Sequence, residues 1–251
     1  MKLYRSLIYR ELMLTRKRFI LMLILFLLLA LLMMTPLILV FIFKPVEGEE
    51  SPLEMIPLFV GIVALTGGFM AGTNNGLQKA DISSGWKRYS FVLPPTAKQQ
   101  AMSDLLVELC YILFFGLLSA AYTWIYNAAA DYNAFGIMLN IYLGAVCAIM
   151  LIDIAYSYII MFAKTKKDLG LIGIIAFFGA GVILKVVGLF INVDFPEQPN
   201  EDGDLISDEA INSFVTKLSS EKLTLCIFAV FVVLCILFFL AMWRSHERRE
   251  P

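Results

Sequence analysis

The sequence predicts an all-α integral membrane protein with six transmembrane helices, and three observations predict this class. Of its 251 residues, 60% are hydrophobic and 16% are charged, with a mean hydropathy of +0.80, whereas soluble domains carry about 25% charged residues. The apolar residues form continuous runs of the roughly 20 residues that a helix needs to cross a bilayer. Such runs favour helices over β-barrel strands, which alternate over about ten residues. Basic residues, finally, gather between alternate runs.

Six apolar runs define the predicted spans, within a single transmembrane domain that covers residues 1–251. The spans are 19–43, 55–72, 104–127, 134–163, 169–192 and 223–243. The first is not a cleavable signal peptide, because its apolar run exceeds the about 7–15 residues of a signal sequence and no small-residue cleavage site follows it. The fourth is longer than a bilayer requires, so we expect it to tilt or to protrude.

The distribution of Lys and Arg predicts the orientation in the membrane. Sixteen of the 20 lie in four segments, namely 1–18, 73–103, 164–168 and the tail after residue 243. The alternate connections hold few basic residues, and two of them, 44–54 and 193–222, are rich in acids. Because basic residues concentrate in cytoplasmic segments, both termini and the 73–103 loop are predicted to be cytoplasmic.

Two helices are predicted outside the spans. In the first segment, 1–18, the apolar residues Tyr4, Leu7, Ile8 and Leu12 recur at helical spacing among basic residues. This pattern predicts an amphipathic interfacial helix on the inner leaflet, with its basic side against lipid phosphates. The outer connection, 193–222, has its own one-sided apolar pattern, which predicts a short external helix before span six. Alternatively, both are ordinary juxtamembrane helices without a mechanical role.

The sequence contains no pattern that predicts catalysis or metal binding. Its one histidine, His246, falls in the tail, where we expect it to be solvated. No nucleophile elbow, zinc-protease motif or phosphate-cradling loop occurs, so we expect no enzyme activity and no ATP hydrolysis by this chain alone. The four cysteines, Cys110, Cys147, Cys226 and Cys235, fall inside spans without metal-site spacing, so we expect buried packing thiols.

Two ionisable residues deep inside the predicted spans are candidates for function. Asp153 lies in span four and Lys185 in span five, and an unpaired charge is costly in the membrane. They could form an inter-span ion pair or line a polar cavity. Alternatively, Lys185 snorkels outward and Asp153 faces a structural hydroxyl. Glu108 lies near the inner end of span three, where we expect solvent to reach it.

Three glycines spaced four residues apart, Gly68, Gly72 and Gly76, predict a helix-packing interface. Small residues at this spacing allow two helices to approach closely. The pattern does not identify the partner helix.

The loop after span two contains an aromatic and basic stretch, SSGWKRYSFVLPPT, at 83–96. Ser83 or Ser84 can cap a short helix and Gly85 permits a tight entry, while Pro94 ends the helix by disfavouring helical geometry at Leu93. The stretch carries Trp86, Lys87, Arg88, Tyr89 and Phe91. Aromatic residues beside Arg are typical of protein–protein hot spots, although the stretch could instead be an aromatic belt that lies on lipid.

These features together resemble the permease subunit of type-2 ABC exporters. The resemblance is sharpest at 81–106, DISSGWKRYSFVLPPTAKQQAMSDLL, and departs from the family at Pro95, which leaves the end of the helix open. It implies a cytoplasmic coupling helix that seats in a cleft of an ABC ATPase. The residues implied in coupling are Gly85, Trp86, Lys87, Arg88, Tyr89, Phe91, Leu93 and Pro94.

The resemblance also implies the partners and the substrate class. The permease would pair with a second copy or a paralogue in a bacterial plasma membrane, and the ATPase subunits, not this chain, would bind ATP and Mg. Short permeases of this kind resemble exporters of amphipathic peptide toxins such as phenol-soluble modulins. The alternatives are a drug or bacteriocin resistance permease, and a non-transporting membrane scaffold or sensor subunit. No nucleic-acid partner is expected.

Overall fold

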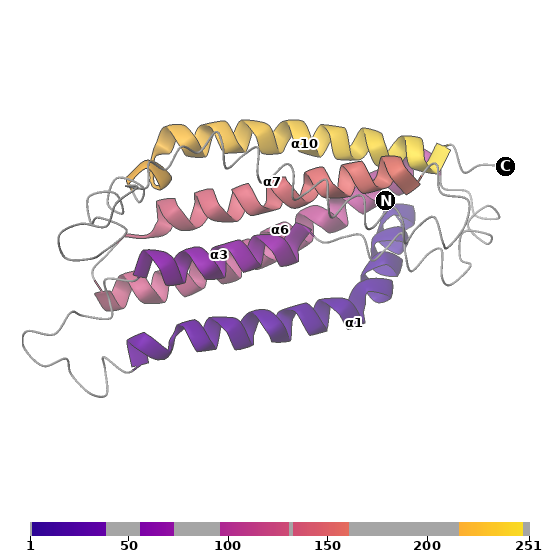
Figure 1. The fold of residues 1–251 in the computed structure, drawn as a ribbon. Coiled ribbons are helices and arrows are strands. Elements are labelled where there is room, and N and C mark those ends of the chain that lie inside the picture. Colours follow the sequence, from indigo (N-terminus) through magenta and orange to yellow (C-terminus); the bar gives the residue numbers. More distant parts are fainter. Residues whose placement is uncertain (1, 39–55, 73–95, 131–132, 161–215, 248–251) are drawn as a thin grey trace, which may run out of the picture.

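The computed structural model describes residues 2–38, 56–72, 96–130, 133–160 and 216–247, which are almost entirely helical (Figure 1). The five long helices are α1 (Lys2–Met33), α3 (Ile56–Gly72), α6 (Ala97–Ala130), α7 (Phe135–Ile160) and α10 (Glu221–Glu247). Within this part of the chain, four apolar helical segments are long enough to cross a membrane: Leu7–Ile38, Ala97–Ala129, Phe135–Ala155 and Glu221–Glu247. The shorter α3 is also apolar. The chain is therefore an all-α protein with the helices of a membrane protein.

The described helices form one antiparallel bundle. α1 and α6 run in one direction, and α3, α7 and α10 run in the other (Figure 1). We call the end where α1 and α6 begin and the other three helices finish the polar end, and the opposite one the far end. α7 and α10 run parallel to each other (Figure 1). The predicted fifth span, 169–192, lies outside the described residues.

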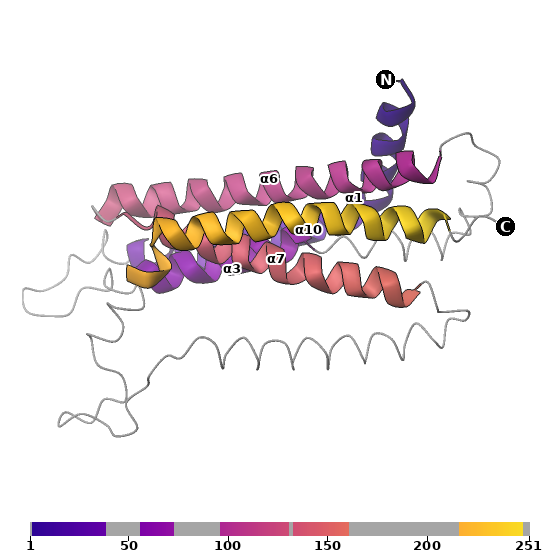
Figure 2. The ribbon, with the colours of Figure 1, turned by 90° about the horizontal axis from the view of Figure 1, so that it is seen from above.

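The bundle is centred on α6 and α7. Both α3 and α10 pack on these two helices, whereas α1 lies at the edge against α6 and α3 (Figures 1 and 2). Each helix contributes to one continuous apolar core, whose large members include Phe26, Val60, Phe115, Tyr142 and Phe238. The helices nearer the centre are more deeply buried. In the most apolar 18-residue stretch of α7, 56% is buried, whereas in that of the first helical segment only 11% is. The outer face of α1 is therefore a broad apolar surface, suited to lipid rather than to water.

The helix starts follow from capping chemistry that the apolar pattern does not reveal. α6 begins at Ala97, before the predicted start of span three at residue 104. Thr96 and Gln99 form a reciprocal capping box, in which each side chain accepts a hydrogen bond from the main-chain N–H of the other. α10 begins after Ser220, whose hydroxyl oxygen accepts from the N–H of Leu223. These polar caps extend both helices beyond their apolar cores.

α1 is one continuous helix, where the sequence predicts an interfacial helix, 1–18, followed by a separate span, 19–43. Its first turns bend away from the rest (Figure 1), and the Thr15 hydroxyl donates to the main-chain oxygen of Glu11 at 2.8 Å, a contact that often bends helices. Of the predicted apolar face, Leu7 is buried but Leu12 is 40% exposed. The buried stripe instead runs through Leu7, Glu11 and Thr15, of which Glu11 and Thr15 contact α6.

A proline interrupts the main-chain hydrogen bonding of the first helical segment just after α1, near the far end of the bundle. Pro36 has no N–H to donate to the main-chain oxygen of Leu32, and the hydroxyl of Thr35 donates to that oxygen at 2.7 Å instead. The Tyr126 hydroxyl from α6 donates to the main-chain oxygen of Met33. These side chains satisfy two of the carbonyls that a helix terminus leaves open.

Candidate functional site

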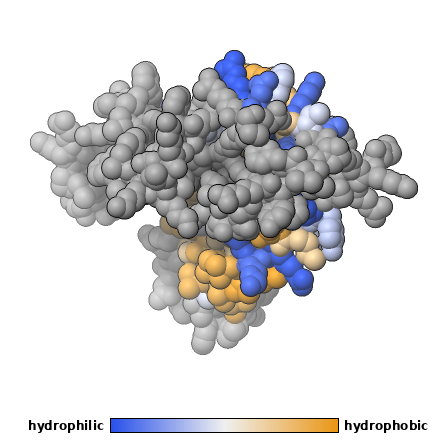
Figure 3. All heavy atoms as spheres, turned by 90° about the vertical axis from the view of Figure 1, so that its right-hand side faces the viewer, coloured by the Kyte–Doolittle hydropathy of each residue, from blue (hydrophilic) through white to orange (hydrophobic). Residues whose placement is uncertain are grey.

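Most of the deeply buried polar side chains lie in the half of the bundle toward the polar end, although Ser119, Thr123 and Asn140 are buried nearer the far end. Those toward the polar end come from four helices, and each is at most 1% exposed: Glu11, Ser103, Glu108, Asp153, Ser157 and Ser245. Seen from this end, the described surface carries both hydrophilic and hydrophobic side chains (Figure 3). Burial of polar groups is costly unless they are bonded, so apolar packing alone does not explain the residues found here. The polar end is the candidate functional site.

Glu11 joins α1 to α6. The Ser103 hydroxyl donates to a carboxylate oxygen of Glu11 at 2.6 Å, and the Arg10 guanidinium lies 3.8 Å from the same oxygen. One turn further along, the hydroxyls of Thr15 and Tyr111 hydrogen-bond to each other. Two polar contacts therefore join the first half of α1 to α6.

Glu108 is buried in the middle of the bundle, so the prediction that solvent reaches it is wrong. Its side chain is fully buried, on a helix against which α3, α7 and α10 pack. The residue lies near the start of the apolar run of α6, but α7 and α10 both pack over it. Its position in the sequence therefore did not reveal its burial.

His246 is also buried further than predicted. It lies in the last turn of α10, where its Nε2 is 2.9 Å from the Asp104 carboxylate and its side chain is only 14% exposed. One turn earlier on α10, Trp243 lies 6.0 Å from the ammonium of Lys98, a cation–π distance. The end of α10 is thus attached to the first turns of α6 by two contacts, and His246 is not in a solvated tail.

Asp153 is 1% exposed near the polar end of α7. The Ser157 hydroxyl, one turn later, donates to the main-chain oxygen of Asp153 at 2.8 Å and lies 3.9 Å from the sulfur of Met242 on α10. Lys185, the predicted partner of Asp153, lies outside the described residues. Their pairing stays a prediction.

Gly68 and Gly72 lie where α3 packs against α7. A Cβ atom at Gly68 would be 2.7 Å from the main-chain oxygen of Tyr142, and one at Gly72 would be 2.8 Å from the side chain of Ile149. Both distances are shorter than any normal contact, so only glycine allows this approach. Gly76, the third member of the predicted set, lies outside the described residues.

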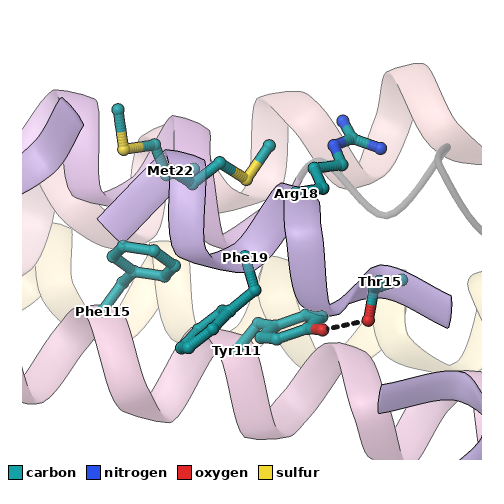
Figure 4. A pocket seen from close by; sticks show the side chains of 7 residues that line it. Thr15, Arg18, Phe19, Met22, Tyr111 and Phe115 are labelled. Atoms are coloured by element: carbon teal, nitrogen blue, oxygen red, sulfur yellow. Dashed lines mark hydrogen bonds between the residues drawn. The ribbon is translucent and has the colours of Figure 1, made fainter. Parts of the chain in front are cut away.

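A small open pocket lies between α1, α3 and α6, close to the polar end. The hydrogen-bonded hydroxyls of Thr15 and Tyr111 lie at one end of it and Phe115 at the other, while the Arg18 guanidinium points away from the two hydroxyls (Figure 4). Phe19 lies between the two ends and stacks on Tyr111 with ring centroids 5.4 Å apart. The pocket is therefore lined mainly by apolar side chains, with the two hydroxyls at one end.

The four cysteines differ in burial. Cys147 is buried as predicted and Cys235 is half-buried, but Cys110 and Cys226 are exposed, so burial was wrong for those two. The predicted coupling residues, from Gly85 to Pro94, lie outside the described residues. Among the described residues, no group of three or more His, Cys, Asp or Glu side chains could hold a metal ion.

Sequence reasoning missed Glu11, Ser103 and Asp104 as contact residues. The signal that could have identified Glu11 is the four-residue spacing of Leu7, Glu11 and Thr15, which places a carboxylate on the same helical face as an apolar residue.

Comparison with protein families, with curated proteins and with solved structures finds no match for this chain.

Proposed function

We propose that this chain is the permease subunit of an ATP-driven exporter, which assembles with separate cytoplasmic ATPase subunits and a second permease. The observation that carries the proposal is the 83–96 stretch, which resembles the coupling helix of type-2 ABC exporters. In this proposal the polar end faces the cytoplasm of a bacterial cell, and the helices cross its plasma membrane. The ATPase subunits bind ATP and Mg.

The contacts around the start of α6 support a coupling role for the preceding loop. α3 ends at Gly72 and α6 begins at Ala97, both at the polar end, so the segment between them starts and finishes on that side. Within the first turns of α6, Ser103 bonds Glu11 on α1 and Asp104 bonds His246 on α10. A displacement of the coupling helix by the ATPases would therefore reach three helices together.

This arrangement suits alternating access. Packed helices move as rigid elements between discrete arrangements, and the polar contacts that join α1, α6 and α10 would make their polar ends move as a unit. We propose amphipathic peptides as the substrates, such as cytolytic toxins or antimicrobial peptides, because they could enter an apolar helix bundle from the inner leaflet. Export of drugs or bacteriocins would use the same mechanism.

The double variant Trp86→Ala/Arg88→Ala tests the coupling role. It removes the aromatic and the basic anchor that we assign to the ATPase contact, so the ATPase should co-purify at a much lower ratio while the permease still inserts into the membrane. Trp124→Ala is the matched control, because Trp124 is 65% exposed near the far end and should leave co-purification unchanged. Undiminished co-purification with the double variant would remove the coupling role. A genome in which no ATPase gene neighbours this one would favour a scaffold.

A further inference from the structure

We propose that the contact between His246 on α10 and Asp104 on α6 is a pH-sensitive link, which tightens when the imidazole of His246 gains a proton. The proposal is independent of the exporter function. It rests on the geometry of the contact, on its access to water and on its place at the end of a helix.

The contact changes its character when the imidazole is protonated. The Nε2 atom of His246 lies 2.9 Å from a carboxylate oxygen of Asp104, which is an ordinary hydrogen-bond distance. A neutral imidazole can donate a proton from Nε2 to this oxygen, whereas a protonated imidazole donates the same bond and carries a positive charge as well. The attraction between the two charges then adds to the hydrogen bond. Protonation therefore strengthens a contact that is already formed.

Histidine is the residue whose charge ordinarily changes nearest to neutral pH, between about pH 5 and pH 8. Carboxylates generally keep their negative charge through this range, because they gain a proton only at lower pH. A fall in pH through the range thus charges one partner of such a pair and leaves the other charged. His246 is the single histidine of the chain, so no second imidazole can produce the same response.

The contact is open enough for protons to reach it from water. The side chains of His246 and Asp104 are 14% and 13% exposed, whereas Glu11, Glu108 and Asp153 are each at most 1% exposed. Partial exposure lowers the cost of placing a charge at this position. The remaining burial keeps enough water away for the charge attraction to contribute.

The place of His246 in the last turn of α10 also favours its charged form. The open carbonyl groups at the C-terminus of a helix carry a partial negative charge, which attracts a cation. The described helices that pack on α10 are α6 and α7, and the charged residues of these two helices and of the last turns of α10 are Lys98, Asp104 and Glu108, Asp153, and Arg244 and Glu247. Of these six, only Asp104 lies within ion-pair distance of His246. It is therefore the charge that decides how the contact responds to pH.

The sign of the response follows from what the imidazole meets in the folded chain. Asp104 and the helix terminus lie beside His246 only when α6 and α10 are packed, so folding favours the protonated form. The contact therefore stabilises the bundle most at the acidic end of the range, and this contribution is lost as the pH rises. Mild acidification would attach the end of α10 more firmly to the first turns of α6.

Thermal unfolding of the purified full-length chain in detergent, at about pH 5.5 and about pH 8, tests the proposal. His246→Gln keeps a hydrogen-bond donor but cannot be charged. The melting temperature of the wild type should exceed that of this variant by about 2–4 °C more at the lower pH than at the higher pH. Asp104→Asn removes the other charge and should abolish this pH-dependent difference. The matched control is Arg244→Gln, which removes an exposed cation from the same turn and should change the melting temperature by the same amount at both pH values.

Three results would overturn the proposal. An equal difference between the wild type and His246→Gln at both pH values would show that the charge on the imidazole does not strengthen the contact. A smaller difference at the lower pH would show that burial disfavours the charge more than Asp104 favours it. An undiminished pH-dependent difference when His246→Gln is introduced into Asp104→Asn would show that another group is the partner. If His246→Gln does not fold, Asp104→Asn decides, because its loss of melting temperature should also be larger at the lower pH.

Discussion

At the scale of single residues, the closest contact between helices depends on the absence of one side chain. Gly68→Ala would place a Cβ atom 2.7 Å from the main-chain oxygen of Tyr142 and 2.7 Å from the Cβ of Ala145. Neither atom can move without shifting α7, so we expect the variant to lose about 1–3 kcal/mol of stability, as overpacked sites do. Thermal unfolding in detergent measures the loss.

Gly144→Ala is the matched control for this prediction. Gly144 lies on α7, and in the described part of the chain no atom beyond its chain neighbours and nearby helix backbone lies within 4 Å of the position that its Cβ would take. Alanine forms helices better than glycine by about 1 kcal/mol, so the control should be neutral or slightly more stable. Equal behaviour of the two variants would show that α3 and α7 do not need a glycine at their contact.

The second residue-scale prediction concerns Asp153 and Lys185. If the two pair across spans four and five, Asp153→Asn and Lys185→Met should each cost about 3–5 kcal/mol, because each strands the other charge in a medium of low dielectric. The double variant should recover part of this loss, since no uncompensated charge remains. A double-mutant cycle on thermal stability measures the coupling, and simply additive losses would show that the residues act independently.

At the scale of elements, polar contacts add to the apolar packing that holds α1 on the bundle, and they lie along its first half. Ser103→Ala removes the hydrogen bond to the Glu11 carboxylate, and a bond to a charged group contributes about 1.5–3 kcal/mol. We expect the first turns of α1 to detach more often, so that trypsin cleaves faster after Arg16 and Lys17. The rate of this cleavage in the purified chain is the measurement.

Glu247→Gln is the control for the α1 prediction, because it alters an exposed carboxylate at the end of another helix. It should leave cleavage after Arg16 unchanged. Combining Ser103→Ala with Glu11→Gln should add little to the first variant, since both act on one bond. Cleavage at the wild-type rate in Ser103→Ala would mean that α1 is held by its apolar contacts alone.

At the scale of the whole molecule, the proposed division of labour predicts what the chain does in isolation. The sequence has no loop that cradles phosphates, so the purified chain should hydrolyse ATP no faster than background. Vanadate-sensitive turnover should appear only when the partner ATPase subunits are added. Robust turnover by a preparation free of other subunits would contradict the proposal, and mass spectrometry of that preparation is the necessary control.

The sequence by itself determined the class of the protein and the approximate position of the described helices. α3, Ile56–Gly72, nearly coincides with the predicted span 55–72, and α7, Phe135–Ile160, falls inside the predicted 134–163. This succeeded because the length of an apolar run is a local property, which can be read without knowing what the run packs against. The glycine spacing in α3 likewise predicted a close contact, although not its partner.

Only the tertiary structure decided which polar side chains are buried and what they contact. Glu11 and Ser103 are 92 positions apart in the chain, and Asp104 and His246 are 142 apart. Burial of Glu108 depends on α7 and α10, which follow it in the chain. A side chain is buried by neighbours that the fold brings to it, and these neighbours are set by how helices pack rather than by the local sequence. The same reason explains why Leu12 is exposed although its helical spacing places it with Leu7 and Ile8.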